Sequence, residues 1–529
     1  MSPASSAPPA RPPADLAPRP RAVPLDLDAL AALADADTVP AVNETRLHVT
    51  GITHRTSDVR PGDLFAALPG ARVHGADFAG AALRAGAVAV LTDPAGLTRP
   101  ELAAAVERGS VRVLLHPHPR TVLGALASAV YGDPTDELSV LGVTGTSGKT
   151  TVAHLLEAGL AEAGRETGLL GTVQTRIRGE RLPSAFTTPE APDLQALFAV
   201  MLERGVTDVA MEVSSHALAL GRVAGTRFAV GAFTNLSQDH LDFHTDMEDY
   251  FAAKAKLFLD PQLRAERGVV CVDDEWGNRL ANLAPEAITV STTIPAEWTI
   301  RDLVVEPSGA QRCVVRHPAG EVPLRLQLPG AFNIANALVA LAVLDLVGVA
   351  PGVAAPRFAQ LQVPGRMQRV DAGQEFLAVV DYAHKPAAVS ALLDALKAQQ
   401  PSGKLITVLG CGGDRDTGKR PMMGAAAAAR SDILIVTDDN PRTEDPAEIR
   451  AAMLAGAETA TPRGDIVEIG DRRAAIIAAV ELAKPGDVVV VAGKGHETGQ
   501  EIHGVKHPFD DAAVLRAELD RAISERQDT

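Results

Sequence analysis

A glycine-rich segment at residues 145–151, Gly-Thr-Ser-Gly-Lys-Thr-Thr, constrains the fold more than any other part of this sequence. It follows an apolar run at 138–143 and precedes a stretch of helical character at 152–163. A strand, a glycine turn and a helix N-terminus in this order form a phosphate cradle, because backbone N–H groups and the helix dipole face the anion. Only the shorter G-x-x-G-K-T form is present, since residue 143 is valine. The alternative is a turn that merely joins a strand to a helix, but the Lys-Thr-Thr that follows favours an ATP site with bound Mg²⁺.

Composition and charge narrow the class of protein. The chain has 529 residues, of which 46% are hydrophobic, and a formal net charge of −16. This length predicts about three to four domains. The negative charge argues against nucleic acid or an anionic membrane as the main partner. The three cysteines are too few and too scattered for a disulfide framework or a zinc site, which fits a reducing compartment.

Targeting and membrane-spanning segments would also be recognisable in the sequence. Residues 1–24 are rich in proline and alanine and lack the apolar core of a signal peptide, so we predict a disordered leader. No run of about 18 apolar residues occurs elsewhere. We therefore expect a cytoplasmic monomer with no membrane insertion.

The chain divides into three blocks of mixed α and β character. Short elements at 25–136 suggest a small accessory domain. Strand-like and helix-like stretches alternate at 137–362, which predicts an α/β domain with a mainly parallel sheet. The alternation restarts near 363 and continues to 529, which predicts an open α/β domain that binds ligands at the carboxyl ends of its strands.

Three strands of the third block end in polar segments. These segments lie at 410–415, 438–442 and 493–497. Because parallel strands place their carboxyl ends at one sheet edge, we expect the three segments to form one binding site.

Several single residues of the second block carry candidate chemistry. Glu212 ends a predicted strand beside the phosphate cradle, where a carboxylate can bind Mg²⁺. His240 alone would be a structural histidine, but together with Glu212 it favours a metal or phosphate role. Lys254, from its spacing alone, is expected to be a solvated surface lysine.

Seven motifs together resemble one family, the Mur ligases. They occur in the family's order at 144–151, 211–216, 239–242, 330–336, 381–384, 412–416 and 493–497, and the resemblance spans about residues 45–520. Details at 381–386 look most like actinobacterial members. The resemblance implies three α/β domains: a small N-terminal UDP-binding domain, a central P-loop ATPase-like domain and a C-terminal Rossmann-like domain that binds the amino acid.

The resemblance also implies roles for individual residues. ATP would be bound by Gly145, Thr146, Ser147, Gly148, Lys149, Thr150, Thr151, Asn333, Asn336 and Arg366. The catalytic residues would be Lys149, Glu212, His240 and Lys254, and Mg²⁺ would be bound by Thr150, Glu212, His240 and Lys254, with Lys254 carbamylated. The UDP-sugar-peptide would be held by Thr56, Thr187, Thr188, Ser214 and Arg222. The incoming amino acid would be held by Arg415, Asp439, Asn440, Pro441, Arg442, Gly493 and Glu497.

The segment 439–442, Asp-Asn-Pro-Arg, resembles the signature of members that add diaminopimelate. An arginine there can bind the distal carboxylate of diaminopimelate as a bidentate pair, whereas lysine would leave that cation unpaired. The resemblance implies that ATP activates the D-glutamate γ-carboxylate of UDP-N-acetylmuramoyl-L-alanyl-D-glutamate as an acyl phosphate. The amine of diaminopimelate, expected to be the meso isomer, would then attack it.

Some positions depart from the family pattern. Arg55-Thr56-Ser57 stands where Asp-Ser-Arg is frequent, which leaves the uracil contacts open, although Thr56 still supplies a hydroxyl. Cys271 replaces a common asparagine, and its expected state is a buried, inert thiol. Lys385 follows 381–384, where members have a neutral residue, and it leaves the roles of Asp381 and His384 unassigned.

Two rival interpretations remain at this stage. One is a related ligase, such as a lysine-adding or folylpolyglutamate enzyme, against which the first block and 439–442 argue. The other is a catalytically silent nucleotide-binding scaffold, against which the intact Lys149, Glu212, His240 and Lys254 argue.

Overall fold

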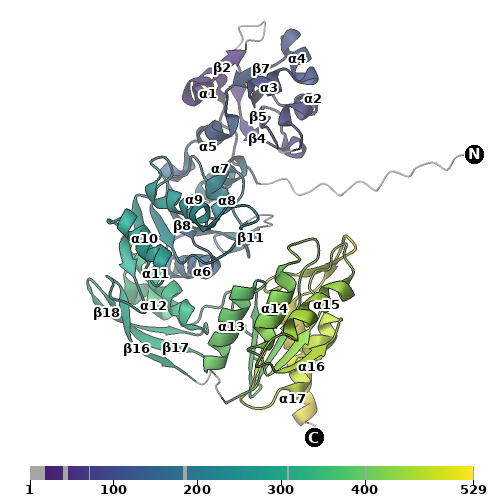
Figure 1. Ribbon diagram of the computed structural model, residues 1–529. Coiled ribbons are helices and arrows are strands. Elements are labelled where there is room, and N and C mark those ends of the chain that lie inside the picture. Colours follow the sequence, from purple (N-terminus) through teal and green to yellow (C-terminus); the bar gives the residue numbers. More distant parts are fainter. Residues whose placement is uncertain are drawn as a thin grey trace, which may run out of the picture. The chain divides into compact units, whose positions relative to one another are not determined.

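The computed structural model describes residues 18–39, 46–70, 72–182, 187–306, 309–399 and 402–527 (Figure 1). Most of the predicted leader at 1–24 thus lies outside the described residues. Its last part, 18–24, has irregular backbone, and Arg19 forms a 2.6 Å ion pair with Asp63. The chain divides into two compact units, which we describe separately: the first contains described residues within 1–144, 165–231 and 238–268, and the second those within 145–164, 232–237 and 269–529.

The first unit begins with a five-stranded sheet covered on both faces. Its strand order is β2-β7-β6-β5-β4, with β4 to β7 parallel and β2 antiparallel to β7. Leu64 and Phe65 are adjacent on β5 but belong to different hydrophobic cores, as alternating residues of a two-sided sheet must. The strands are β1 (Leu25–Asp26), β2 (Asp37–Val39), β3 (His48–Val49), β4 (Gly51–Thr53), β5 (Asp63–Ala66), β6 (Ala89–Thr92) and β7 (Arg112–Leu115), where β1 pairs with β3. The helices are α1 (Leu27–Ala34), α2 (Ala79–Arg84), α3 (Pro94–Leu97), α4 (Pro100–Glu107) and α5 (Pro119–Val130), with 3₁₀ turns at Thr56–Asp58, Gly75–Phe78 and Pro134–Asp136.

A second sheet of this unit carries candidate site residues at its strand ends. Its order here is β11-β10-β9-β12-β8, with β9, β12 and β8 parallel and β10 and β11 joined as an antiparallel hairpin. The strands are β8 (Ser139–Thr144), β9 (Thr167–Leu170), β10 (Thr175–Ile177), β11 (Glu180–Leu182) and β12 (Asp208–Glu212). The helices are α7 (Ala191–Glu203), α8 (Ser215–Ala219) and α9 (Met247–Leu259), and strands β13 (Val230–Phe233) and β14 (Arg267–Cys271) run across the division between the two units.

The second unit opens with a helical layer around α6. Gly159 of α6 lies so close to α11 that a Cβ there would be 2.4 Å from a methyl carbon of Leu344, so a larger residue would require this leucine to move. The helices are α6 (Lys149–Glu162), α10 (Glu275–Leu283), α11 (Ala331–Leu346) and α12 (Pro351–Phe358). The strands are β15 (Ile288–Val290), parallel to β14, and the antiparallel β16 (Thr299–Val305), β17 (Gln311–His317) and β18 (Gly320–Leu326). This antiparallel sheet was absent from the sequence-based expectation of a mainly parallel domain.

The C-terminal part of the second unit is a doubly wound sheet of order β19-β20-β24-β21-β22-β23. Only β19 is antiparallel. Residues of α13, α14 and α15 share one hydrophobic core and residues of α16 and α17 share the other, so the two helix groups cover opposite faces (Figure 1). The strands are β19 (Gln368–Arg369), β20 (Leu377–Asp381), β21 (Leu405–Leu409), β22 (Ile433–Val436), β23 (Asp465–Glu468), β24 (Val488–Ala492), β25 (Gly499–Ile502) and β26 (Val505–Pro508). The helices are α13 (Pro386–Gln399), α14 (Lys419–Ala428), α15 (Pro446–Ala457), α16 (Arg472–Leu482) and α17 (Asp511–Gln527).

The three cysteines are buried in the second unit, two of them on strands of different sheets and the third in the core beside the C-terminal sheet. Cys271 ends β14, Cys313 lies on β17, and Cys411 packs in the core beneath the C-terminal sheet. Burial raises the pKa of Cys271 to about 12, that of Cys313 to about 11 and that of Cys411 to about 12. An inert thiol was expected at Cys271, and its burial and raised pKa agree with that.

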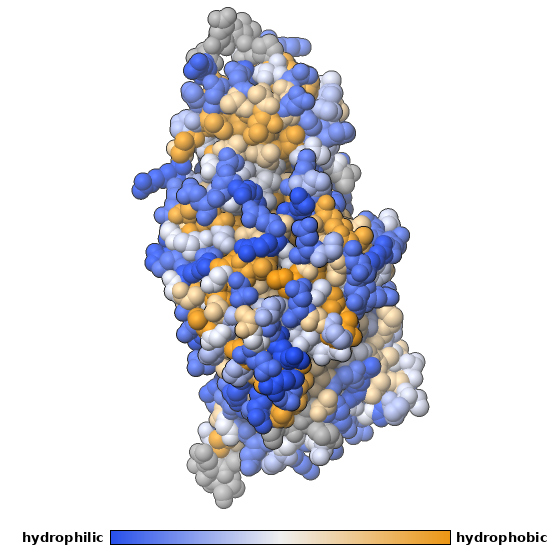
Figure 2. Space-filling view, turned by 90° about the vertical axis from the view of Figure 1, so that its left-hand side faces the viewer, coloured by the Kyte–Doolittle hydropathy of each residue, from blue (hydrophilic) through white to orange (hydrophobic). Residues whose placement is uncertain are grey.

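The visible surface mixes polar and apolar residues. Figure 2 shows apolar groups interrupted by hydrophilic ones on the face drawn. In the described part of the chain, no helix has the length and apolar character needed to cross a membrane.

Candidate active site

The glycine turn is built as a phosphate cradle. Gly145 and Gly148 have φ of +144° and +88°, and a Cβ on Gly148 would lie 2.3 Å from the Asn336 side-chain oxygen. Both positions therefore require glycine. Lys149 begins α6, and its Nζ donates to the carbonyl oxygens of Gly145 at 2.8 Å and Thr146 at 2.9 Å. The lysine thus lies over the loop, where a phosphate group would meet its charge.

The predicted adenine-contacting asparagines lie beside this loop. Asn333 and Asn336 occupy the first turns of α11 and are buried. Asn336 donates to the side-chain oxygen of Asn333 at 3.1 Å, and Asn333 donates to the Pro329 carbonyl oxygen at 2.6 Å. The close approach of Asn336 to Gly148 brings the pair to the cradle.

Arg366 also reaches the cradle. Its guanidinium lies 4.4 Å above the ring centroid of Tyr382, and one Nη is 3.5 Å from the Thr150 hydroxyl oxygen. Stacking on an aromatic ring orients the planar guanidinium. Asp381 accepts backbone N–H bonds from Met367 at 2.7 Å and Ala383 at 2.8 Å, and burial raises the pKa of its carboxyl. Asp381 therefore shapes the backbone that carries Arg366.

Two histidines flank Tyr382 in a neutral state. Their ring centroids lie 4.5 Å (His384) and 5.1 Å (His496) from that of Tyr382. Burial, together with nearby cations, lowers the pKa of His384 to about 4 and that of His496 to about 3. Both imidazoles therefore stay uncharged near neutral pH.

These low pKa values predict acid sensitivity. Between pH 6.5 and about 4 the unfolded chain binds protons that the folded protein does not, so the free energy of unfolding falls as the pH falls. Each histidine contributes at most about 1.4 kcal/mol per pH unit. We expect the thermal unfolding midpoint to fall less steeply with pH in the His384→Asn, His496→Asn double variant than in the wild type. His503→Asn, an exposed control, should keep the wild-type slope; an unchanged slope in the double variant would contradict the prediction.

Glu212 lies at the end of β12 in the first unit and is 1% exposed. Its two carboxylate oxygens accept from the Thr172 backbone N–H at 2.8 Å and the Thr172 hydroxyl at 3.1 Å. The Thr188 hydroxyl donates to the Glu212 carbonyl oxygen at 2.9 Å, and Thr187 lies 3.0 Å from Thr172 between hydroxyl oxygens. The Ser214 N–H bonds to the Thr188 hydroxyl at 3.3 Å. Four of the residues predicted to bind substrate or metal are thus close together at one strand end. Thr172 also belongs to this cluster, although no sequence motif identified it.

Lys254 is buried, which corrects the expectation from its spacing. It is 1% exposed on α9, and its Nζ lies 4.5 Å from the ring centroid of Tyr250. Tyr250, Lys254 and Leu257 are spaced by four and three residues, so they share the inward face of the helix. A buried ammonium requires partners or neutralisation, which makes this position chemically significant.

His240 lies near the same tyrosine as Lys254, with 6.1 Å between the ring centroids of His240 and Tyr250. Its backbone φ is +54°, a conformation uncommon outside glycine, and its ring lies 4.8 Å from that of His216 between centroids. Among the described residues no group of three or more His, Cys, Asp or Glu is arranged to hold a metal ion. The predicted donors nevertheless suit Mg²⁺ chemically if Lys254 carries a carbamate, because the set then supplies oxygens from Glu212 and Lys254 beside the His240 imidazole.

A carboxylate holds the predicted substrate-binding arginine of the first unit. Glu190 contacts Arg222 Nε at 2.8 Å and Arg120 Nη1 at 3.3 Å. Arg222 also donates to the Thr188 carbonyl oxygen at 3.4 Å. Arg120 lines a cavity of about 420 Å³ that also contains Thr56. A continuous polar wall therefore runs from this cavity to the Glu212 cluster.

Arg55, which precedes Thr56, also lines this cavity and forms ion pairs with two carboxylates. One of its Nη atoms is 3.0 Å from both carboxylate oxygens of Asp193, and its Nε is 2.6 Å from Asp58. At 55–57, where the chain departs from the family pattern, the Arg55 charge is thus paired with nearby carboxylates.

The three polar strand ends of the C-terminal sheet come together. Asn440 donates to Glu497 at 2.8 Å, and a Cβ on Gly493 would lie 2.7 Å from Asp439. Arg442 has φ of +54°, donates to the Gly413 carbonyl oxygen and lies 3.5 Å from Glu501. Arg415 is exposed. Lys494 and Glu501 join this cluster, although the motif analysis gave them no role.

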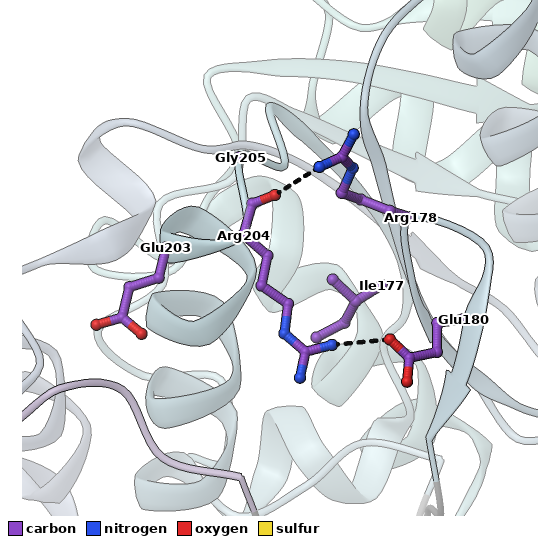
Figure 3. A pocket seen from close by; sticks show the side chains of 6 residues that line it. All are labelled: Ile177, Arg178, Glu180, Glu203, Arg204 and Gly205. Carbon is purple, nitrogen blue, oxygen red and sulfur yellow. Dashed lines mark hydrogen bonds and ion pairs between the residues drawn. The ribbon is translucent and has the colours of Figure 1, made fainter.

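A larger cavity of about 760 Å³ lies elsewhere and contains none of the predicted residues. Figure 3 shows it between the β10–β11 hairpin and the end of α7, where Arg204 pairs with Glu180 at 3.1 Å and Arg178 donates to the Arg204 carbonyl oxygen. These side chains satisfy one another at the surface, and the cavity size alone does not indicate a ligand.

Comparison with known proteins identifies the class. Residues 48–131 match the Mur ligase family catalytic domain, 143–344 the Mur ligase middle domain, and 365–495 the glutamate ligase domain of Mur ligases. The chain belongs to the Mur ligase family and is an ATP-dependent ligase, which confirms the resemblance and the fold class.

Individual relatives are more specific. A UDP-N-acetylmuramoyl-L-alanyl-D-glutamate--2,6-diaminopimelate ligase of Corynebacterium glutamicum is 52% identical over 504 residues, 93% of this chain and 96% of the relative. A ligase of the same name from Streptomyces avermitilis is 53% identical over 482 residues, 90% of this chain and 93% of the relative. A solved structure of a ligase of that name has a TM-score of 0.64 and 34% identity, covering 90% of this chain and 96% of that one. The MurF ligase of Thermotoga maritima in complex with ADP, at 18% identity, TM-score 0.59 and coverage of 90% and 98%, shows the shared fold alone.

Proposed function

We propose that this enzyme ligates diaminopimelate, as the meso isomer, to the D-glutamate γ-carboxylate of UDP-N-acetylmuramoyl-L-alanyl-D-glutamate, using ATP. The observation that carries the proposal is the polar cluster at the C-terminal strand ends, where Arg442 and Glu497, 55 residues apart in the sequence, are linked through Glu501 and Asn440. Relatives at 52% and 53% identity bear the name of this activity. The reaction consumes ATP and a nucleotide-linked precursor, so we place it in the cytoplasm, in peptidoglycan precursor synthesis.

The charges of the pocket suit a diamino dicarboxylic acid. Diaminopimelate has an ammonium and a carboxylate at its distal centre. The Arg442 guanidinium supplies donors for that carboxylate, and Glu497 supplies an acceptor for that ammonium. Arg442 would exchange its contacts with Gly413 and Glu501 for the ligand. Lysine has no distal carboxylate and would leave the arginine without a new partner.

The residues of the first unit would hold the second substrate. We propose that the uridine end occupies the cavity around Thr56 and that the sugar-peptide follows the polar wall of Arg222 and Thr188 toward Glu212. The segment 25–136 would thus act as the UDP-binding domain, 137–362 as the ATP-binding domain and 363–529 as the amino-acid-binding domain.

The chemistry requires charge control during phosphoryl transfer. Lys149 would offset the negative charge that gathers on the phosphates, while the loop N–H groups orient them. Two magnesium ions would neutralise charge on the phosphates and the acceptor carboxylate. Thr150 would hold one at the nucleotide, and Glu212, His240 and carbamylated Lys254 would hold the second at the acceptor. The amine then attacks the acyl phosphate, phosphate leaves and the amide forms.

Phosphate release from ATP tests the proposal directly. The UDP-sugar dipeptide is supplied with meso-diaminopimelate, LL-diaminopimelate or L-lysine in parallel. We expect turnover with meso-diaminopimelate and little with lysine. Turnover with lysine alone would overturn the amino-acid assignment and keep the ligase, and no turnover with any acceptor would reject the function.

Replacing Arg442 tests the recognition of the distal carboxylate. Loss of one bidentate charged contact costs about 2–4 kcal/mol, so Arg442→Ala should lower kcat/KM for diaminopimelate by about 30- to 1000-fold. KM for ATP should stay within about twofold, because the variant leaves the phosphate cradle intact. Arg463→Ala, an exposed arginine beyond α15, is the matched control. An unchanged kcat/KM in Arg442→Ala would show that this arginine does not bind the distal carboxylate.

A further inference from the structure

Lys494 is a fully buried lysine to which the proposed chemistry gives no role. It is 0% exposed and lies between Gly493 and Gly495, whose φ angles are +114° and +55°. These left-handed conformations turn the backbone sharply on either side of the lysine. The side chain therefore points inward, although its neighbours form the edge of the amino-acid pocket.

The Lys494 ammonium belongs to a closed triangle of hydrogen bonds. Its Nζ donates to Asn440 Oδ1 at 3.0 Å and to Glu497 Oε2 at 3.1 Å, and Asn440 Nδ2 donates to the same Oε2 at 2.8 Å. The Glu501 backbone N–H also donates to Asn440 Oδ1, at 2.9 Å. Because Lys494 and this N–H can only donate, they fix the amide orientation of Asn440 and direct its NH₂ group at Glu497.

The two carboxylate oxygens of Glu497 differ in the hydrogen bonds that they accept. Oε2 receives both donors, and in the described part of the chain no hydrogen bond reaches Oε1. The Glu497 side chain is 34% exposed while that of Lys494 is 0% exposed. One oxygen of this partly exposed carboxylate thus accepts two hydrogen bonds, and the other keeps its acceptor capacity.

We propose that Lys494 is the positioning residue that holds Glu497 for recognition of the distal ammonium of the diamino acid. This inference rests on the proposed function and deepens it, because it names the residue that sets the orientation of the acceptor. Without the lysine cation, Asn440 alone contacts Oε2, and the carboxylate rotates among orientations that the ligand must then select.

Steady-state kinetics with Lys494→Met tests the role. The variant should raise KM for diaminopimelate at least about tenfold, which corresponds to about 1.4 kcal/mol, and leave KM for ATP and for the UDP-sugar dipeptide within about twofold. A purely structural role would instead reduce the active fraction, lowering kcat with all three KM values unchanged, and that result overturns the proposal. Lys397→Met, which removes the 2.6 Å ion pair between Lys397 on α13 and Asp432, is the control in the same C-terminal part. Lys494→Gln serves in its place if the Met variant does not fold.

A double-mutant cycle shows whether Lys494 acts through Glu497. If it does, adding Lys494→Met to Glu497→Gln should change KM for diaminopimelate less than about twofold, because the acceptor is already altered. Additive effects would contradict the inference. A wild type that ligates no diamino acid rejects the proposed function, whereas an active wild type with an unchanged KM in Lys494→Met rejects this inference alone.

Discussion

Replacing Lys254 by alanine is expected to reduce kcat by about 10³-fold, the largest effect predicted for a single residue of this enzyme. Lys254 is 1% exposed, so its side chain lies where an anion formed by carbamylation would remain shielded from water. Such an anion resembles a carboxylate and would bind magnesium with Glu212 and His240. Alanine removes the anion and leaves a space in its place.

The same space allows a rescue experiment. Bicarbonate at high concentration with a short carboxylic acid should restore part of the Lys254→Ala activity, measured as phosphate release, because the acid can occupy the position of the carbamate. Lys256→Ala, on the same helix but half-buried, should keep wild-type activity and show no response to the acid. Full activity of Lys254→Ala without any additive would show that the carbamate is not needed.

Replacing Lys149 by methionine is expected to lower kcat by about 10²- to 10³-fold. The lysine cation lies over the carbonyl oxygens of Gly145 and Thr146, and methionine keeps its length but removes the charge that would meet the phosphates. KM for diaminopimelate should stay within about twofold, since the amino-acid pocket is unaltered.

Two measurements keep this prediction specific. The thermal unfolding midpoint should change little, which separates a loss of chemistry from a loss of structure. Lys484→Met, an exposed lysine of the C-terminal part, should retain full turnover. A wild-type kcat in Lys149→Met would show that the lysine charge does not contribute to phosphoryl transfer.

Local signals in the sequence accounted for the main elements. The glycine turn predicted a strand at 138–143 and a helix at 152–163, and the structure has them at Ser139–Thr144 and Lys149–Glu162. The helix begins earlier because the left-handed Gly148 is its N-cap. Buried and exposed residues alternate along β17 and β18, as they do on strands with one covered face. This antiparallel pair was nevertheless not predicted, because the domain was expected to be mainly parallel.

Contacts between distant segments were beyond sequence reasoning. Lys254 was predicted to be solvated because charged residues usually are, and tertiary packing reversed that outcome. Asn440 and Lys494 are 54 residues apart, and no periodicity indicates that their side chains meet. The motifs indicated which loops share a sheet edge, whereas the hydrogen bonds between them follow from side-chain directions that only the folded chain defines.

The three buried cysteines have a practical consequence. Because each thiol is buried in or beside a different sheet and has a pKa of about 11 to 12, the native protein should react slowly with alkylating reagents. Alkylation at Cys271, Cys313 or Cys411 then requires the sheet around that residue to open. The rate at each position, followed by peptide mass spectrometry, would report how often that sheet opens, so the natural chain already contains three reporters of regional stability.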